Sequence, residues 1–250
     1  MPFFGRFRAV FFHQASSPHV FLVVSPFFRA SPIRHRRRSP TYAASNKSRH
    51  YYAIMTVLEK TSTSTTFVDL ASAVEDESIV TIRLTDVEIA GGDDDAFRLS
   101  RSLRGHPNLE EVSLTNITLK QEGMKLDAMI EMLLVSSQNL KTLKLDNVPV
   151  QAKSVATLAY CETLTTLALP NNSFNDVDAK AIADSVEASN SVTTVDLSGN
   201  KISDIGCKSL GQCLDKNKVI EKISLAGNSI SGAESNKLES TLQARAAVAA

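Results

Sequence analysis

The sequence contains no tryptophan and only three cysteines, Cys161, Cys207 and Cys213, in 250 residues. Three scattered cysteines are too few for a disulfide framework or a metal-ligand cluster. We therefore expect reduced thiols and a reducing compartment, and we predict a cytoplasmic location. Cys207 and Cys213 lie where small side chains are expected to pack, and Cys behaves as a small hydrophobe in such positions.

Long hydrophobic runs are also missing. The longest extends from Val20 to Phe28, contains Pro26, and is about half as long as a segment that crosses a bilayer. We expect neither a membrane-spanning helix nor a membrane partner.

Acidic residues are absent from residues 1–54, where eight arginines and one lysine give a charge of +9. The remaining chain has 18 basic and 27 acidic residues, a charge of −9. An Arg-rich, acid-poor extension is typical of a mitochondrial or plastid transit peptide. The alternative is translated upstream sequence before a true start at Met55. In either case we expect residues 1–54 to be disordered, with residues 55–66 as a linker to the folded domain.

Motifs for catalysis are scarce. Beyond Met55 the chain has one histidine, His106, so any nucleophile–histidine arrangement would depend on it alone. Asp93, Asp94 and Asp95 could ligate a divalent ion, but their position after two glycines favours the N-terminus of a helix, where acids face the helix dipole. We predict no enzymatic activity, no cofactor and no metal. The charge of −9 also argues against a nucleic-acid partner.

A repeat organises the rest of the chain. VTTVDLSGNKI (192–202) recurs 28 residues later as IEKISLAGNSI (220–230), with apolar residues at places one, four, six and eleven and Asn at place nine. The same frame fits four earlier segments, which begin at residues 79, 109, 140 and 164. Six copies in succession exclude chance, and the pattern is that of a leucine-rich repeat.

Each repeat predicts one strand followed by one helix. Places four and six alternate with polar residues, which is the period of a strand with one buried face. Between the strands the apolar spacing becomes helical, and Ser203 and Asp204 are suitable residues to begin such a helix. The residues Phe67, Leu70 and Val74 predict a helix that caps the N-terminal end of the array.

A unit of about 28 residues with one strand and one helix resembles the ribonuclease-inhibitor class of leucine-rich repeats. The motifs LALPNNSF, VDLSGNKISDIGCKSLGQCL and ISLAGNSISGAES carry the resemblance, which covers residues 67–245. It implies an α/β leucine-rich-repeat solenoid of about six repeats, a short horseshoe with parallel strands on the concave face and helices on the convex face. Protein binding is the usual activity that it implies.

The asparagine at place nine predicts a ladder that satisfies buried backbone groups in adjacent turns. Asn172, Asn200 and Asn228 can form it, whereas the first three units have an apolar residue there. Those units instead have Asp86, Asn116 and Asn147 one place earlier, which could substitute through a shifted turn.

The predicted function is a non-catalytic, monomeric scaffold that binds an unidentified protein. The strand positions that leave the core hold no aromatic residue, so no hot spot of the usual kind is visible, and a solvated face with binding through edges or loops stays open as an alternative. A GTPase-activating protein of the Ran type and a tropomodulin-like actin-binding protein have similar repeats, and these two functions also stay open. The predicted contacts are Arg83, Glu111, Lys144, Asp146 and Asp196.

Overall fold

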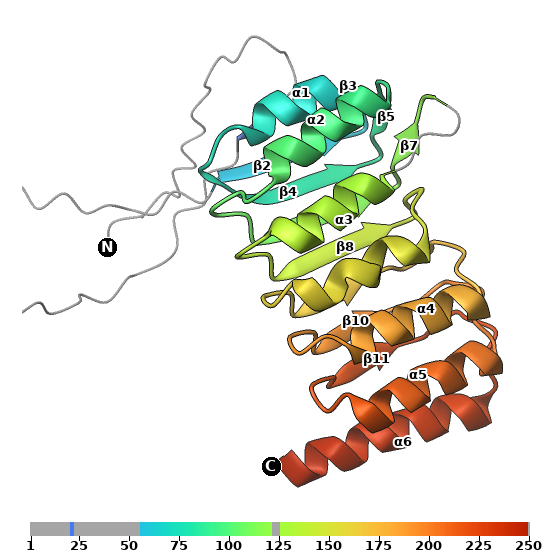
Figure 1. Cartoon of the computed structure of the whole chain (residues 1–250). Helices are drawn as coiled ribbons and strands as arrows, with labels where there is room; N and C mark the ends of the chain where they lie inside the picture. Colours follow the sequence, from blue (N-terminus) through green and yellow to red (C-terminus); the bar gives the residue numbers. More distant parts are fainter. Residues whose placement is uncertain (1–20, 23–55, 122–125, 250) are drawn as a thin grey trace, which may run out of the picture.

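The computed structural model describes residues 21–22, 56–121 and 126–249. Except for residues 21–22, the predicted extension of residues 1–54 lies outside the described residues. Strands and helices alternate along the chain and stack into one elongated array, from α1 at one end to α6 at the other (Figure 1). The elements are β1 (Phe21–Leu22), β2 (Thr56–Thr61), β3 (Ser64–Thr66), α1 (Phe67–Val74), β4 (Ile79–Thr85), β5 (Glu88–Ala90), α2 (Asp93–Leu103), β6 (Glu111–Thr115), β7 (Thr118–Leu119), α3 (Asp127–Ser136), β8 (Thr142–Asp146), the 3-10 helix η1 (Ala152–Tyr160), β9 (Thr166–Ala168), α4 (Asp176–Glu187), β10 (Thr194–Asp196), α5 (Asp204–Lys216), β11 (Lys222–Ser224) and α6 (Gly232–Ala249).

The main sheet has the strand order β1-β2-β4-β6-β8-β9-β10-β11. Every neighbouring pair is parallel except β1 and β2. Residues at place four are paired across the sheet from Ile82 through Leu143 to Ile223. The register therefore confirms the repeat frame, and the fold is an α/β solenoid in which each helix connects two parallel strands.

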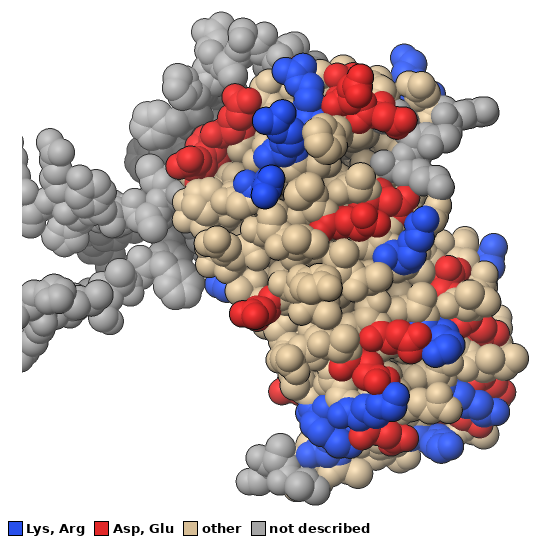
Figure 2. All heavy atoms as spheres, in the orientation of Figure 1, with Lys and Arg blue, Asp and Glu red and all other residues tan. Residues whose placement is uncertain are grey.

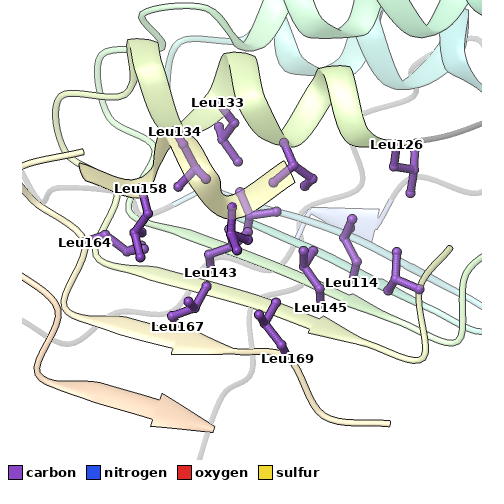
Figure 3. Packing of buried hydrophobic residues seen from close by; sticks show 14 of the residues in the cluster. Leu114, Leu126, Leu133, Leu134, Leu143, Leu145, Leu158, Leu164, Leu167 and Leu169 are labelled. Carbon is purple, nitrogen blue, oxygen red and sulfur yellow. The ribbon is translucent and has the colours of Figure 1, made fainter. Parts of the chain in front are cut away.

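The core lies between the sheet and the helices. In the central units the residues at places one, four and six are completely buried, as Leu140, Leu143 and Leu145 illustrate. In Figure 3 the side chains of Leu143 and Leu145 lie on the side of the strand that faces α3, where Leu133 and Leu134 are found. One continuous apolar layer thus runs through all units, because no single strand–helix pair could bury its own face.

Polar residues cap the helices as their sequence suggests. The Ser203 side chain accepts a hydrogen bond from the Ile205 N–H at the start of α5. Asp176 of α4 reaches the same turn, where its carboxylate accepts hydrogen bonds from the N–H groups of Ser203 and Gly206. A Cβ at Gly206 would lie 2.7 Å from Asp176 Oδ1, so glycine is required for this close approach between units. The predicted helix at Asp93 is also confirmed, since the Gly92 N–H donates to Asp95.

Residues 56–66 are not a linker in the structure. They form β2 and β3, and β2 pairs with β4 so that Leu58 and Lys60 occupy places four and six of a further unit. The sequence frame missed this unit because Lys60 and Thr65 stand where the other units have apolar residues. Lys60 Nζ donates a 2.7 Å hydrogen bond to Thr65 Oγ1, which gives its ammonium group a partner. Helix α1 consequently belongs to this repeat unit rather than covering the end of the array, because β2 is the strand of the same unit and β1 lies beyond β2 in the main sheet.

The turns at place eight share one backbone conformation. Asp86, Asn116, Asn147, Asn171, Gly199 and Gly227 all have positive φ angles between 51° and 74°. Asn and Gly are the residues that tolerate this left-handed region best. The predicted substitution in the early units takes a specific form, because Asn116 Nδ2 donates to Asp86 Oδ1 and Asn147 Nδ2 donates to Asn116 Oδ1. These are exposed hydrogen bonds between side chains of adjacent units, and they do not involve the buried backbone.

In the early units, the backbone that follows the turn at place eight forms hydrogen bonds with the backbone of neighbouring units. Strands β3, β5 and β7 form a second, three-stranded parallel sheet along one edge of the array. In the later units Asn172, Asn200 and Asn228 bond the turn backbone instead, as predicted. The array ends with α6, whose residue Leu238 is buried. Among the described helices, none combines the length and the apolar character needed to cross a membrane.

Candidate protein-binding surface

The side of the main sheet that faces away from the helices is called here the open sheet face, and it corresponds to the face expected to be concave. Places three and five point to this side because places four and six point into the core. Much of it is formed by small hydroxyl side chains, including Thr142, Thr166 and Thr194 in paired register on β8, β9 and β10. Such a surface offers a row of hydroxyl groups for hydrogen bonding.

Two predicted contact residues form an ion pair between adjacent strands. Arg83 on β4 and Glu111 on β6 approach to 3.0 Å between Nη2 and Oε1. Their side chains are 43% and 34% exposed. An ion pair with this much solvent contact contributes only about 0.2 to 1 kcal/mol. Both groups can therefore exchange partners at small cost.

A second pair lies on the next strand of the sheet. Lys144 Nζ is 3.2 Å from Asp146 Oδ2, two residues along β8. The other oxygen of Asp146 accepts a 2.8 Å hydrogen bond from Asn171 Nδ2, the residue at place eight of the following unit. Asn171 thus positions Asp146. The sequence signal for this hydrogen bond was the recurrence of Asn or Asp at place eight of successive units. The sequence predicted that these side chains would bond the turn backbone, whereas Asn171 bonds a side chain.

Asp196 is separated from the other four predicted residues. It lies on β10, and β9 intervenes between β8 and β10. Its Oδ1 accepts a 2.9 Å hydrogen bond from the Ser198 N–H, which stabilises the turn that follows the strand. The structure therefore brings together Arg83, Glu111, Lys144 and Asp146 on three consecutive strands and leaves Asp196 outside this group.

His106 and the cysteines lie away from the open sheet face. His106 is buried in the connection before β6, with Nε2 3.2 Å from the main-chain oxygen of Asp76. Cys207 and Cys213 are buried free thiols on α5. Burial raises the pKa of both, for Cys213 to about 11. Both thiols are therefore protonated at neutral pH, in agreement with a packing role. In the described part of the chain, no group of three or more His, Cys, Asp or Glu is arranged to hold a metal ion.

Comparison with known proteins supports the repeat assignment. The sequence profile of the family described as "Leucine Rich repeat" matches residues 160–183 and 188–211, which include β9, the first two thirds of α4, β10 and part of α5. The search among curated proteins found no match. The profile and the register together show that the fold is a leucine-rich-repeat solenoid.

Several solved structures are similar at low sequence identity. Internalin C2 from Listeria monocytogenes is 19% identical, with a TM-score of 0.39, over 70% of this chain and 73% of that one. A protein from Bacteroides fragilis is 13% identical, with a TM-score of 0.32, over 68% of this chain and 67% of that one. Actin-binding site 2 of leiomodin-1 is 20% identical, with a TM-score of 0.33, over 36% of this chain and 53% of that one. The chain therefore spans about half of the leiomodin-1 segment.

Proposed function

We propose that this protein is a non-catalytic scaffold of the ribonuclease-inhibitor class that binds another protein through its open sheet face. The observation that carries the proposal is the alignment of Arg83, Glu111, Lys144 and Asp146 on the adjacent strands β4, β6 and β8. Class membership is supported by the units that end the array, in which one strand and one true helix repeat every 28 residues. The binding centre is the group of four charged residues, with Asp196 as a peripheral contact.

The two ion pairs suit exchange with a partner. Each pair is solvent-exposed on at least one side, so opening it costs about 0.2 to 1 kcal/mol. A partner that presents an acid to Arg83 or Lys144 and a base to Glu111 or Asp146 would replace internal pairs with intermolecular ones. Charge patterns of this kind contribute mainly to specificity and to the rate of association.

The test is affinity capture from native lysate with the full-length chain, read by quantitative mass spectrometry. We compare the unchanged protein with Arg83→Glu and Lys144→Glu, and with the control Lys180→Glu on α4. Lys180 is exposed and makes an i,i+4 ion pair with Asp184, so its reversal changes the net charge equally on another face. Partners that are lost with both strand variants and kept with the control support the proposal. Unchanged capture by all three variants removes the open sheet face from it.

The alternative partners give different outcomes in the same experiment. A regulator of the Ran GTPase-activating type would capture a GTPase and accelerate GTP hydrolysis by it, whereas a tropomodulin-like protein would capture actin. We further propose the cytoplasm as the location. N-terminal sequencing of the native protein tests this, because a start at Met55, or at Thr56 after removal of the initiator methionine, indicates translation from Met55 and agrees with a cytoplasmic location. A start elsewhere between residues 2 and 54 indicates cleavage of a transit peptide and overturns the proposal.

A further inference from the structure

A hollow of about 290 Å³ opens between α2, α3 and η1 on the helix side of the array. Its walls are Phe97 and Ser100 of α2, Glu131, Met132 and Val135 of α3, and Thr157 of η1. Phe97 and Val135 are 55% and 54% exposed, although both are large apolar side chains. Two such side chains on opposite walls of one hollow are suited to an inserted apolar group, whose binding would remove them from water.

The helical spacing places charge directly beside this hollow. Phe97 and Arg101 of α2 and Arg104, the residue that directly follows the helix, are spaced at i, i+4 and i+7, so they lie along one side of α2 and its C-terminal end. Arg98 is also exposed on this helix. In the space-filling view basic side chains gather over α2, and an uncharged area continues over part of α3 (Figure 2).

These three arginines differ from most of the other basic side chains on the helices. Among the described residues, none of their guanidinium groups makes an ion pair or a hydrogen bond, whereas Lys180, Lys208 and Lys216 of α4 and α5 are paired with acids. A row of unpaired arginines next to exposed apolar side chains has the composition that protein interfaces favour.

We propose that this hollow, called here the α2–α3 groove, binds an acidic segment of another protein. The segment inserts one apolar side chain between Phe97 and Val135. Acids that flank the inserted side chain would pair with Arg101 and Arg104. Glu131 on the opposite wall repels the same acids, so the charged part of the segment lies toward α2. This fixes the orientation of the bound segment across the groove.

Charge also identifies which occupants fit poorly. The extension of residues 1–54 has a charge of +9 and would meet the arginines with the same sign. An anionic bilayer or nucleic acid would meet Asp93 and Asp94 at the exposed start of α2, together with Glu131. A short acidic segment can contact the arginines while avoiding these acids.

The groove is independent of the open sheet face. It is formed by helices, and the residues of the proposed sheet-side contact lie on strands across the core. The inference therefore does not rest on the proposed function. Together the two surfaces would allow the protein to hold two partners at once.

The test is a fluorescence-anisotropy titration of the full-length chain with a short synthetic peptide that has one leucine among glutamates. The matched probes replace the leucine with alanine, or the glutamates with lysines. We expect saturable binding of the first peptide and at least about tenfold weaker binding of both others, which corresponds to about 1.4 kcal/mol each. Because these probes leave the protein unchanged, this comparison does not depend on the folding of a variant.

Protein variants assign the binding to the groove. Phe97→Ala and the double variant Arg101→Glu/Arg104→Glu are each expected to weaken binding at least about tenfold. The control Lys180→Glu/Lys208→Glu makes the same charge change on α4 and α5 and is expected to bind as the unchanged protein does. Circular dichroism verifies that each variant is folded. Absence of binding to the first peptide, or binding that all variants retain, overturns the proposal.

Two further measurements separate other occupants of the groove. Cosedimentation with phosphatidylcholine–phosphatidylserine vesicles that requires Phe97 and the arginines, without peptide binding, would assign the groove to an anionic lipid surface and overturn the proposal. Sedimentation velocity that shows a Phe97-dependent dimer would assign it to a second copy of the chain, again overturning it. The proposal is supported if the protein is monomeric, does not cosediment with the vesicles and binds the acidic peptide.

Discussion

The side-chain oxygen of Asn200 accepts a 3.0 Å hydrogen bond from the backbone N–H of Asn172, the residue at the same place in the preceding unit. It also accepts from the Phe174 N–H, while Asn200 Nδ2 donates to the main-chain oxygens of Leu169 and Leu197. One buried side chain thus connects two turns. This connection holds successive units in register at the edge of the sheet where the strands end.

Replacement of Asn200 by alanine should therefore be costly. We expect Asn200→Ala to lower the free energy of unfolding by about 2 to 4 kcal/mol, because several buried backbone groups lose their partners at about 1 to 3 kcal/mol each. Urea denaturation measures the change. The control is Asn108→Ala, which removes one exposed hydrogen bond to the Glu77 oxygen and should cost less than about 1 kcal/mol. Equal losses in the two variants would contradict the role assigned to Asn200.

The core contributes a second prediction. Leu197 is completely buried at place six, so Leu197→Ala should cost about 2 to 5 kcal/mol by opening a cavity between β10 and the helices. Leu225 occupies the same place in the last unit but is only partly buried. Leu225→Ala should cost less in the same thermal or urea unfolding experiment. A larger loss for Leu225 would mean that the end of the array is more enclosed than the structure shows.

Asp176 gives the stability a pH dependence. The hydroxyl and N–H of Ser203 hold the pKa of its carboxyl below the ordinary value of 3.8. A depressed pKa in the folded state stabilises the protein above pH 3.8, and this contribution is lost as the pH falls through the folded-state pKa. At about pH 7 the unchanged protein should therefore have a higher free energy of unfolding than Asp176→Ala. This difference should shrink as the pH falls below 3.8.

The control for this experiment is Asp184→Ala. Asp184 makes an exposed ion pair with Lys180, and such a pair contributes about 0.3 to 0.5 kcal/mol on a helix. A difference for Asp176→Ala that stays constant down to about pH 2 would show that the carboxylate charge is not what stabilises the contact with Ser203.

Thiol reactivity checks the packing of α5. Because burial raises the pKa of Cys213 to about 11, its thiolate is a very small fraction of the thiol at about pH 8. We expect iodoacetamide to modify Cys213 much more slowly in the folded protein than in urea, where the pKa returns toward 9.0. Mass spectrometry of the alkylated peptides gives both rates. Equal rates would place Cys213 at the surface.

The polar substitution in the first unit provides a stabilising prediction. Lys60 stands at place six, and burial lowers its pKa although Asp69 opposes the effect. Replacing it and its partner with apolar residues of the repeat frame, as in Lys60→Leu/Thr65→Ile, should leave stability unchanged or raise it, because the apolar pair removes the cost of taking the ammonium group and the hydroxyl out of water. Lys60→Leu alone leaves the Thr65 hydroxyl without its partner and should gain less. Destabilisation by the double variant would show that the ammonium group is required there.

Much of the architecture could be predicted from the repeat alone. The period-2 alternation around Leu143 and Leu145 determines which side chains enter the core. A shift of the strand register by one residue would move these leucines to the solvent side. The same reasoning identified Asn172, Asn200 and Asn228 as the ladder. It failed at residues 56–61, because Lys60 breaks the apolar frame and only the pairing of β2 with β4 reveals the unit.

The contacts between units were decided by tertiary structure. The strand register pairs Arg83 with Ser113, so that Glu111, two residues before Ser113, is its diagonal neighbour on β6. Asp196 is separated from the other charged residues because β9 lies between β8 and β10. The hollow between Phe97 and Val135 depends on how α2 rotates and packs against α3, and strand periodicity does not specify this rotation. The sequence alone determined the repeat, its buried face and its turn residues because these are local patterns. Which surface side chains meet is a property of neighbouring units, and packing between them decides it.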